Sequence, residues 1–226
     1  MKTDLTELVF ILDRSGSMGG LESDTIGGFN AMLARQKAQP GECRITTVLF
    51  DDKLEMLHDR IDLKAASQIT ENEYFVRGST ALLDAIGMTI NKIIGVQKNT
   101  SEDYRAEKVM FVITTDGMEN ASREYSYGKV KELVERQKQN FGWEFIFLGA
   151  NIDAVEVAGR FGIAGNRAQN FNNDSEGIKL NYDVVSNTVA TFRGAPVGAA
   201  IADNWGADIS ADFNGRKPPL KGTARK

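Results

Sequence analysis

Cysteine and histidine are nearly absent from this chain of 226 residues, which contains only Cys43 and His58 of these two types. A lone cysteine excludes an intrachain disulfide and a zinc site built from cysteines. A lone histidine excludes a metal site built from several imidazoles. No run of 18 apolar residues is present, so a membrane-spanning helix is not expected. No apolar stretch with a small-residue cleavage site follows the first residues, so we predict no secretory signal and a cytoplasmic protein.

An excess of positive charge is also lacking, since 27 basic residues face 31 acidic residues and the net charge is −4. Five of the basic residues lie in the last eleven positions, 216–226, where no acidic residue occurs. The body of the chain is therefore acidic, which makes it a poor surface for nucleic acid. We interpret the basic end as a solvated tail whose contacts with nucleic acid are at most weak, and we predict no membrane partner.

Candidate strands and helices alternate along the chain. Several stretches are nearly continuous apolar runs, which is typical of strands buried on both faces of a parallel sheet. Between them, apolar residues recur every three or four positions, as in helices with one buried face. The run at 44–50 is followed by a short turn and a second run at 54–61, which predicts a hairpin. The expected strands lie at residues 7–13, 44–50, 54–61, 108–115, 143–148 and 168–171.

This alternation predicts an α/β fold over residues 5–193. We expect a doubly wound, mostly parallel and Rossmann-like sheet of six strands, with one antiparallel edge strand and helices on both faces. Residues 194–226 differ, because they are rich in glycine, alanine and aspartate and their apolar residues follow no period of 3.6 or 2. The scattered apolar residues are Trp205, Ile209 and Phe213. We therefore predict a domain at 5–193 and, at 194–226, an arm that lies on the domain and ends in the basic tail.

Side chains with hard oxygen atoms lie at three places where the predicted sheet ends. Asp13, Ser15 and Ser17 follow the first strand, Thr80 belongs to the Gly-Ser-Thr that begins a long helix, and Asp116 follows the fourth strand. Right-handed crossovers bring the C-terminal ends of parallel strands to one edge of the sheet, where ligands bind. Carboxylate and hydroxyl oxygens suit Mg²⁺, Mn²⁺ or Ca²⁺ and not zinc or copper. These five residues therefore predict a site for a divalent cation, with Mg²⁺ as the first candidate.

In order and spacing, the five residues resemble the metal-ion-dependent adhesion site of von Willebrand factor A domains. The resemblance covers about residues 5–193, and every position of the motif holds the expected residue type. It implies that Ser15 and Ser17 bind the metal directly and that Thr80 binds it directly or through water. It also implies that the two aspartates, Asp13 and Asp116, often act through water or through hydrogen bonds to hydroxyl groups.

The resemblance further implies a protein-binding module and not an enzyme, of the kind that works inside bacterial cells beside ATPases or other assembly machinery. A cation held mainly by neutral hydroxyls keeps positive charge, so it can bind an Asp or Glu side chain of a partner protein. We expect the loops 18–21, 77–79 and 118–123 to set the specificity for that partner. Met18 and Met118 are candidates for an apolar rim.

Two other functions stay open. A metal-assisted phosphoesterase or other hydrolase would need a general base, and the remaining candidates near the site are Asp24 and Glu119. A structural subunit of an assembly would leave the metal site empty. Serine-hydrolase chemistry is disfavoured, because we expect His58 on the surface of an edge strand, far from Ser17. The common glycine-rich phosphate-binding motifs are absent from the sequence.

Overall fold

A computed structural model describes residues 2–216 and contains a six-stranded sheet in the order β3-β2-β1-β4-β5-β6. Only the β2–β3 pair is antiparallel, and the other four pairs are parallel. The predicted fold class is therefore confirmed, including the antiparallel edge strand. The strands are β1 (Lys2–Asp13), β2 (Glu42–Phe50), β3 (Leu54–Asp62), β4 (Ala106–Thr115), β5 (Glu144–Gly149) and β6 (Ala168–Asn170).

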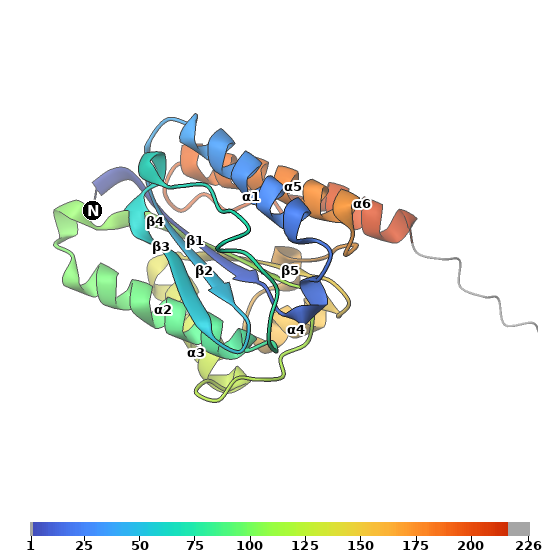
Figure 1. Cartoon of the computed structure of the whole chain (residues 1–226). Helices are drawn as coiled ribbons and strands as arrows, with labels where there is room; N and C mark the ends of the chain where they lie inside the picture. Colours follow the sequence, from blue (N-terminus) through green and yellow to red (C-terminus); the bar gives the residue numbers. More distant parts are fainter. Residues whose placement is uncertain (1, 217–226) are drawn as a thin grey trace, which may run out of the picture.

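Helices cover both faces of the sheet (Figure 1). Side chains alternate along β1, so that Leu8, Phe10 and Leu12 enter one core and Val9 and Ile11 enter the other. The first core is closed by α1, α5 and α6, and the second by α2, α3 and α4. The helices are α1 (Glu22–Lys37), α2 (Leu82–Asn99), α3 (Tyr127–Phe141), α4 (Ala154–Arg160), α5 (Ser175–Gly194) and α6 (Ala207–Gly215). The short 3₁₀ turns are η1 (Gly16–Met18), η2 (Leu63–Ala65), η3 (Glu102–Tyr104) and η4 (Gly165–Arg167).

Helix α2 begins at Leu82, later than the predicted start at residues 78–80. The residues before it hydrogen-bond to other loops instead of to the helix. The amide of Thr80 donates to the side chain of Asn120 at 2.9 Å, and the amide of Ala81 donates to the carbonyl of Asp51 at 2.8 Å. These bonds hold Thr80 in a loop at the C-terminal edge of the sheet.

Close packing of α1 against α5 depends on a glycine. A Cβ atom on Gly28 would lie only 2.2 Å from the ring of Tyr182, so no other residue fits there without movement. Among residues 2–216, no helix is long and apolar enough to cross a membrane.

The region after residue 193 differs from the predicted arm, because it contains the regular helix α6. Ile209 on this helix is only 1% exposed and joins the core between α5 and the sheet. The indole of Trp205 donates a hydrogen bond to the carbonyl of Asn166 at 2.8 Å. A helix of nine residues shows too few apolar positions for its period to stand out in the sequence. Residues 217–226, which carry most of the predicted basic tail, lie outside the described residues, and the domain boundary at 193 stays a prediction.

The predicted surface position of His58 is wrong. His58 lies on the edge strand β3, as expected, but it is 2% exposed, because Phe29 of α1 and Ser67 in the loop after η2 contact its ring. Its Nδ1 atom is 2.9 Å from the hydroxyl of Thr47, and its ring stacks on Phe29. Burial lowers the pKa of His58, so the imidazole is a neutral part of the core at pH 7.

Truncation of Ile209 tests whether α6 is part of the folded core. We expect Ile209→Ala to lower the free energy of unfolding by about 2–4 kcal/mol, because it leaves a cavity beneath the helix. The matched control is Ala211→Ser on the exposed side of α6, which should cost about 0.5 kcal/mol. Urea denaturation measures both values. Equal stabilities of the two variants would show that α6 contributes nothing to the core.

Candidate metal centre

Two acidic side chains are buried side by side at the C-terminal edge of the sheet. Asp13 ends β1 and Asp116 follows β4, and these strands are neighbours and parallel. Asp13 is 2% exposed and Asp116 is 1% exposed. Ser15 and Thr80 are also buried, whereas Ser17 is exposed to solvent. The structure thus brings all five predicted residues together, and their role as metal ligands stays a prediction.

Hydrogen bonds connect the two aspartates through the serines. One oxygen of Asp13 accepts from the amide of Ser15 at 2.7 Å, and the other accepts from the hydroxyl of Thr115 at 2.6 Å. The hydroxyls of Ser15 and Ser17 are 3.2 Å apart. Ser17 donates to Asp116 at 2.5 Å. The two serine oxygens therefore lie between the two carboxylates.

Thr80 joins this group from the loop before α2. A Cβ atom on Gly117 would lie 3.6 Å from the hydroxyl of Ser17 and 3.8 Å from the hydroxyl of Thr80, so both hydroxyls border the glycine after Asp116. The carbonyl of Thr80 accepts from the amide of Asn120 at 3.0 Å. Thr80 is therefore anchored to the loop that follows β4.

Both aspartates are held in an environment that disfavours their charge. Burial raises the pKa of Asp13, and hydrogen bonds from Thr115 and Ser15 offset only part of this effect. Burial also raises the pKa of Asp116, the hydrogen bond from Ser17 opposes the rise, and the charge of Asp13 adds to it. Among the side chains that the structure describes, in residues 4–216, no basic group forms an ion pair or hydrogen bond with either carboxylate. The site therefore lacks positive charge in the protein itself.

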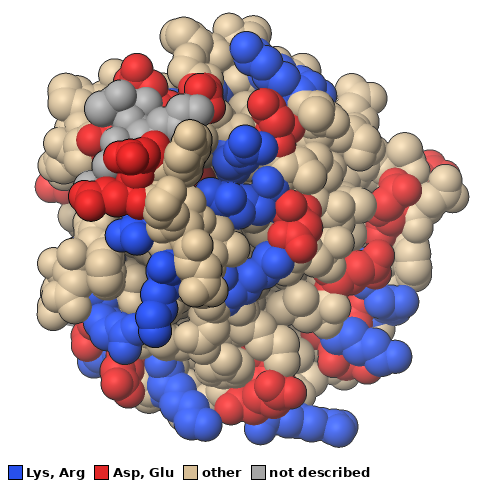
Figure 2. Space-filling view, turned by 90° about the vertical axis from the view of Figure 1, so that its left-hand side faces the viewer, with Lys and Arg blue, Asp and Glu red and all other residues tan. Residues whose placement is uncertain are grey.

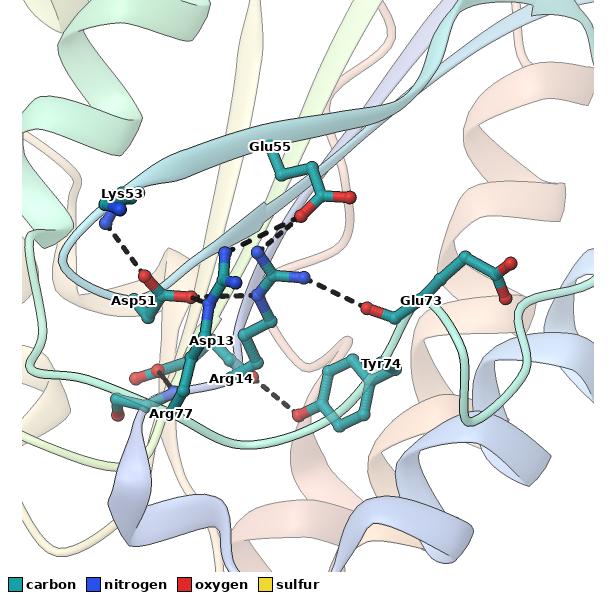
Figure 3. Close-up of polar contacts among 9 residues, drawn as sticks. Asp13, Arg14, Asp51, Lys53, Glu55, Glu73, Tyr74 and Arg77 are labelled. Carbon is teal, nitrogen blue, oxygen red and sulfur yellow. Dashed lines mark hydrogen bonds and ion pairs between the residues drawn. The ribbon is translucent and has the colours of Figure 1, made fainter.

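Arg14, between Asp13 and Ser15, anchors the loop that carries the two serines. The side chain of Arg14 is fully buried and donates to Asp51 at 3.0 Å and to Glu55 at 2.6 Å (Figure 3). Its backbone is held as well, because its carbonyl accepts from the amide of Arg77 at 3.0 Å. The hydroxyl of Tyr74 donates to the carbonyl of Asp13 at 2.6 Å. These contacts leave the serines of this loop free to face the aspartates.

Asp51 shows what happens when a buried aspartate at this edge has basic partners. Burial pushes its pKa upward, but hydrogen bonds from Arg77, from the chain around Asp52 and Lys53, and from Arg14 hold the pKa below its usual value. Arg77 is 2.7 Å from the same carboxylate oxygen as Arg14. Asp51 is therefore neutralised by arginines, whereas Asp13 and Asp116 are not.

Sequence reasoning missed two asparagines that contact Asp116. The side-chain amide of Asn173 donates to its carboxylate at 3.1 Å, and that of Asn151 donates to its carbonyl at 3.3 Å. These residues follow β6 and β5, which end at the same edge as β1 and β4. The signal was available, since polar residues after these two strands could have been included with those after the other strands.

The surface around the site differs in part from the predicted rim. Met18 is 3% exposed and belongs to the core, so its assignment to the rim is wrong. Met118 is 62% exposed, and Phe75 is a further exposed apolar residue at 42%. The ring of Phe75 lies 5.4 Å from the guanidinium of Arg14 and 5.3 Å from that of Arg77. Exposed apolar side chains therefore do lie on the loops near the site.

The donor set suits a hard cation. Nowhere in residues 2–216 do three or more His, Cys, Asp or Glu side chains gather as a metal cluster, so a site here depends on hydroxyl oxygens as well as on two carboxylates. One buried oxygen beside Asp116, Oδ1 of Asn173, has no hydrogen-bond partner. Two uncompensated carboxylates and an unpartnered oxygen fit a small divalent cation with oxygen ligands.

A family model of the von Willebrand factor type A domain matches residues 7–183, which is more than half of the chain. The chain belongs to this family. Domains of this family, here called vWA domains, often mediate metal-dependent protein binding. The helix α6 of this vWA domain lies beyond the matched residues. No curated protein matches the chain.

Solved structures with the same fold include pilus and adhesion proteins. A mutant of the PilB minor pilin from Streptococcus sanguinis is 12% identical, with a TM-score of 0.59 over 84% of this chain and 63% of the pilin chain. The manganese-loaded TRAP protein of Plasmodium vivax is 18% identical, with a TM-score of 0.56 over 80% of this chain and 73% of that chain.

A third structure, the proximal thread matrix protein 1 from the mussel byssus, carries zinc in its metal-ion-dependent adhesion site. It is 11% identical, with a TM-score of 0.55 over 82% of this chain and 46% of that chain. The vWA domain described here thus spans 63% of the pilin chain and less than half of the byssus chain. At these identities the similarity establishes the fold alone.

Replacing Asp116 by asparagine tests the electrostatic account. Because the pKa of Asp116 is raised in the fold, its ionised form at pH 7 opposes folding, and this cost disappears as the pH falls below the raised pKa. We therefore expect Asp116→Asn, in EDTA at pH 7, to unfold at the same or a higher temperature than the wild type. Addition of Mn²⁺ should raise the melting temperature of the wild type only.

The control is Asp51→Asn, which removes the carboxylate that neutralises the buried Arg14. This variant should lose about 3 kcal/mol of stability with or without metal, because it leaves a buried charge without its main partner. A large loss of stability for Asp116→Asn in EDTA would contradict the assignment of Asp116 as an uncompensated charge.

Proposed function

We propose that this vWA domain binds a divalent cation at Asp13, Ser15, Ser17, Thr80 and Asp116, with Mg²⁺ as the first candidate and Mn²⁺ or Ca²⁺ as alternatives. Through this cation it captures an Asp or Glu side chain of a partner protein. The observation that carries the proposal is the pair of buried carboxylates with no basic partner, joined by serine hydroxyls. Solved relatives with manganese or zinc support cation binding in general.

Of the five proposed metal ligands, only Ser17 is exposed, so a partner's carboxylate would reach the cation from the side of Ser17. Ser17 and Gly16 are exposed, whereas Ser15, Thr80 and the two aspartates are buried. A bound cation would supply the positive charge for a partner's carboxylate. Only the side of the site near Ser17 is open to such a group, and Met118 and Phe75 lie on loops beside that opening. The partner segment therefore combines an acidic residue with apolar side chains.

The carboxylates near the site support binding and not hydrolysis. Glu119 was a candidate general base, but its two oxygens accept four hydrogen bonds, from the amides of Leu83, Ala121 and Ser122 and from the Ser122 hydroxyl. Asp24, the other candidate, accepts from the hydroxyl of Ser175 at 2.7 Å. A general base needs a free lone pair beside the substrate. Glu119 is committed to holding its loop, so we favour an interaction module over an enzyme.

The face opposite the candidate site has a charge distribution that disfavours binding of nucleic acid there. Figure 2 shows acidic and basic side chains intermixed over the end of the molecule opposite the candidate site, without a continuous basic area on that face. Binding to nucleic acid depends on clustered positive charge.

The cytoplasmic location and the similarity to intracellular bacterial members stay predictions, and several structural neighbours are pilus proteins.

Calorimetry tests cation binding directly. We expect the wild type to bind one Mn²⁺ or Mg²⁺, and the double variant Ser15→Ala, Ser17→Ala to bind none, because it lacks the two hydroxyls between the carboxylates. Its circular dichroism spectrum should match that of the wild type. The control is Ser101→Ala, an exposed serine before η3, which should bind as the wild type does. Unchanged binding by the double variant would place the cation elsewhere.

Affinity capture tests the acidic partner. We expect a protein to be retained by the immobilised wild type in Mg²⁺, to be released by EDTA, and to be absent with the double serine variant. Converting the carboxylates of the applied proteins to amides with a carbodiimide should also abolish retention, because the bound group is an Asp or Glu. Retention that survives either EDTA or amidation would contradict capture through the cation.

An assay with a generic aryl phosphate tests the alternative of a phosphoesterase. We expect the Mg²⁺-loaded protein to release no more phenol than Mg²⁺ alone, because the oxygens of the candidate base Glu119 are occupied by four hydrogen bonds. Turnover that disappears in the double serine variant would show that the site is catalytic.

A further inference from the structure

The loop between β6 and α5 reaches the candidate metal centre from outside the five-residue motif. The side-chain amide of Asn173 donates to Oδ2 of Asp116 at 3.1 Å. The other oxygen of this carboxylate, Oδ1, accepts from Ser17 at 2.5 Å. Asp116 is thus held on one side by a motif residue and on the other by a residue that no motif includes.

The amide of Asn173 has a fixed orientation, and this orientation leaves one oxygen unsatisfied. An ionised carboxylate can only accept hydrogen bonds, so the NH₂ group must face Asp116. The amide oxygen Oδ1 then points elsewhere, and it is buried with no hydrogen-bond partner among the described residues. A buried polar atom without a partner costs about 1–3 kcal/mol, and in native proteins it is satisfied by water or an ion.

We propose that Asn173 is a sixth residue of the metal centre. Its NH₂ group orients Asp116, and its Oδ1 atom supplies a further oxygen to the coordination sphere of the cation, directly or through one water molecule. This inference rests on the proposed function, since it needs a cation at the five residues. It also goes beyond that function, because it assigns a role to a loop that the motif does not cover.

The C-terminal helix holds this loop in place. The side chain of Asn172 donates to the carboxylate of Asp212 on α6 at 2.9 Å. Arg216 at the end of α6 is 2.7 Å from Asp174, which caps the start of α5 by accepting from the amide of Gly177 at 2.8 Å. Asn173 therefore lies between two residues that are tied to α6.

The loop between β6 and α5 also packs tightly against the start of α5. A Cβ atom on Gly177 would lie 1.9 Å from the carbonyl oxygen of Asn172, so the loop rests directly on the first turn of α5. Because α6 lies beyond residues 7–183, the support of Asn173 comes from a part of this chain that the family model does not match. The extension thereby contributes to the metal centre of this particular vWA domain.

Titration with Mn²⁺ alone, followed by calorimetry, tests the assignment. We expect Asn173→Ala to bind Mn²⁺ about 10-fold more weakly than the wild type, since residues that support metal ligands typically contribute factors of 10–100. Asn172→Ala should weaken binding less, because Asn173 keeps its contact but loses the tie to α6. The matched control is Asn140→Ala, an exposed asparagine at the end of α3, which should leave the affinity unchanged.

A second measurement separates this role from a purely structural one. In EDTA, Asn173→Ala should melt close to the wild-type temperature, because the loss of the hydrogen bond to Asp116 and the removal of a buried oxygen without a partner oppose each other. With Mn²⁺, a higher relaxation rate of water protons for the variant would show that Oδ1 binds the metal directly, because water then replaces it, and an equal rate together with weaker binding would show a contact through water. Equal Mn²⁺ affinities of the variant and the wild type would overturn this inference alone. Failure of the wild type to bind Mn²⁺ would overturn the proposed function as well.

Discussion

Two buried aspartates, Asp13 and Asp116, lie together at the C-terminal edge of the sheet without a basic partner in the described chain. Folding has to place these like charges side by side, and burial raises the pKa of both. Asp51, at the same edge, is equally buried but is neutralised by Arg14 and Arg77. The arginines therefore stabilise the scaffold of the site, while the charge of the two aspartates is left for a cation to balance.

The rest of the fold serves to hold the residues of this edge. Parallel pairing of β1 with β4 brings the two aspartates together, and the buried Arg14 holds the loop that carries the serines. Two hydrogen bonds between Thr80 and Asn120 keep Thr80 out of helix α2 and beside Ser17. On the far side, α6 supports the loop of Asn173 through Asn172. Each contact positions an oxygen atom at this edge of the sheet.

The sequence alone was sufficient for the sheet and for the five motif residues, because both depend on local patterns. Apolar runs mark strands buried on two faces, and the motif residues directly follow those strands. The burial of His58, the helix α6 and its support of the loop around Asn173 could not be predicted in the same way. Each depends on which distant segment covers a given surface: α6 against the β6–α5 loop, and α1 with the loop after η2 against His58. Single positions such as Ile209 carry this packing without forming a visible period.

Diffraction from crystals soaked in Mn²⁺, recorded at a wavelength where manganese scatters anomalously, would locate the cation. We expect one anomalous peak between the carboxylates of Asp13 and Asp116, within bonding distance of the hydroxyls of Ser15 and Ser17. A carboxylate from a neighbouring molecule or from the buffer should occupy the open side. A fully soaked crystal with no peak at these residues, or with its only peak elsewhere, would contradict the account.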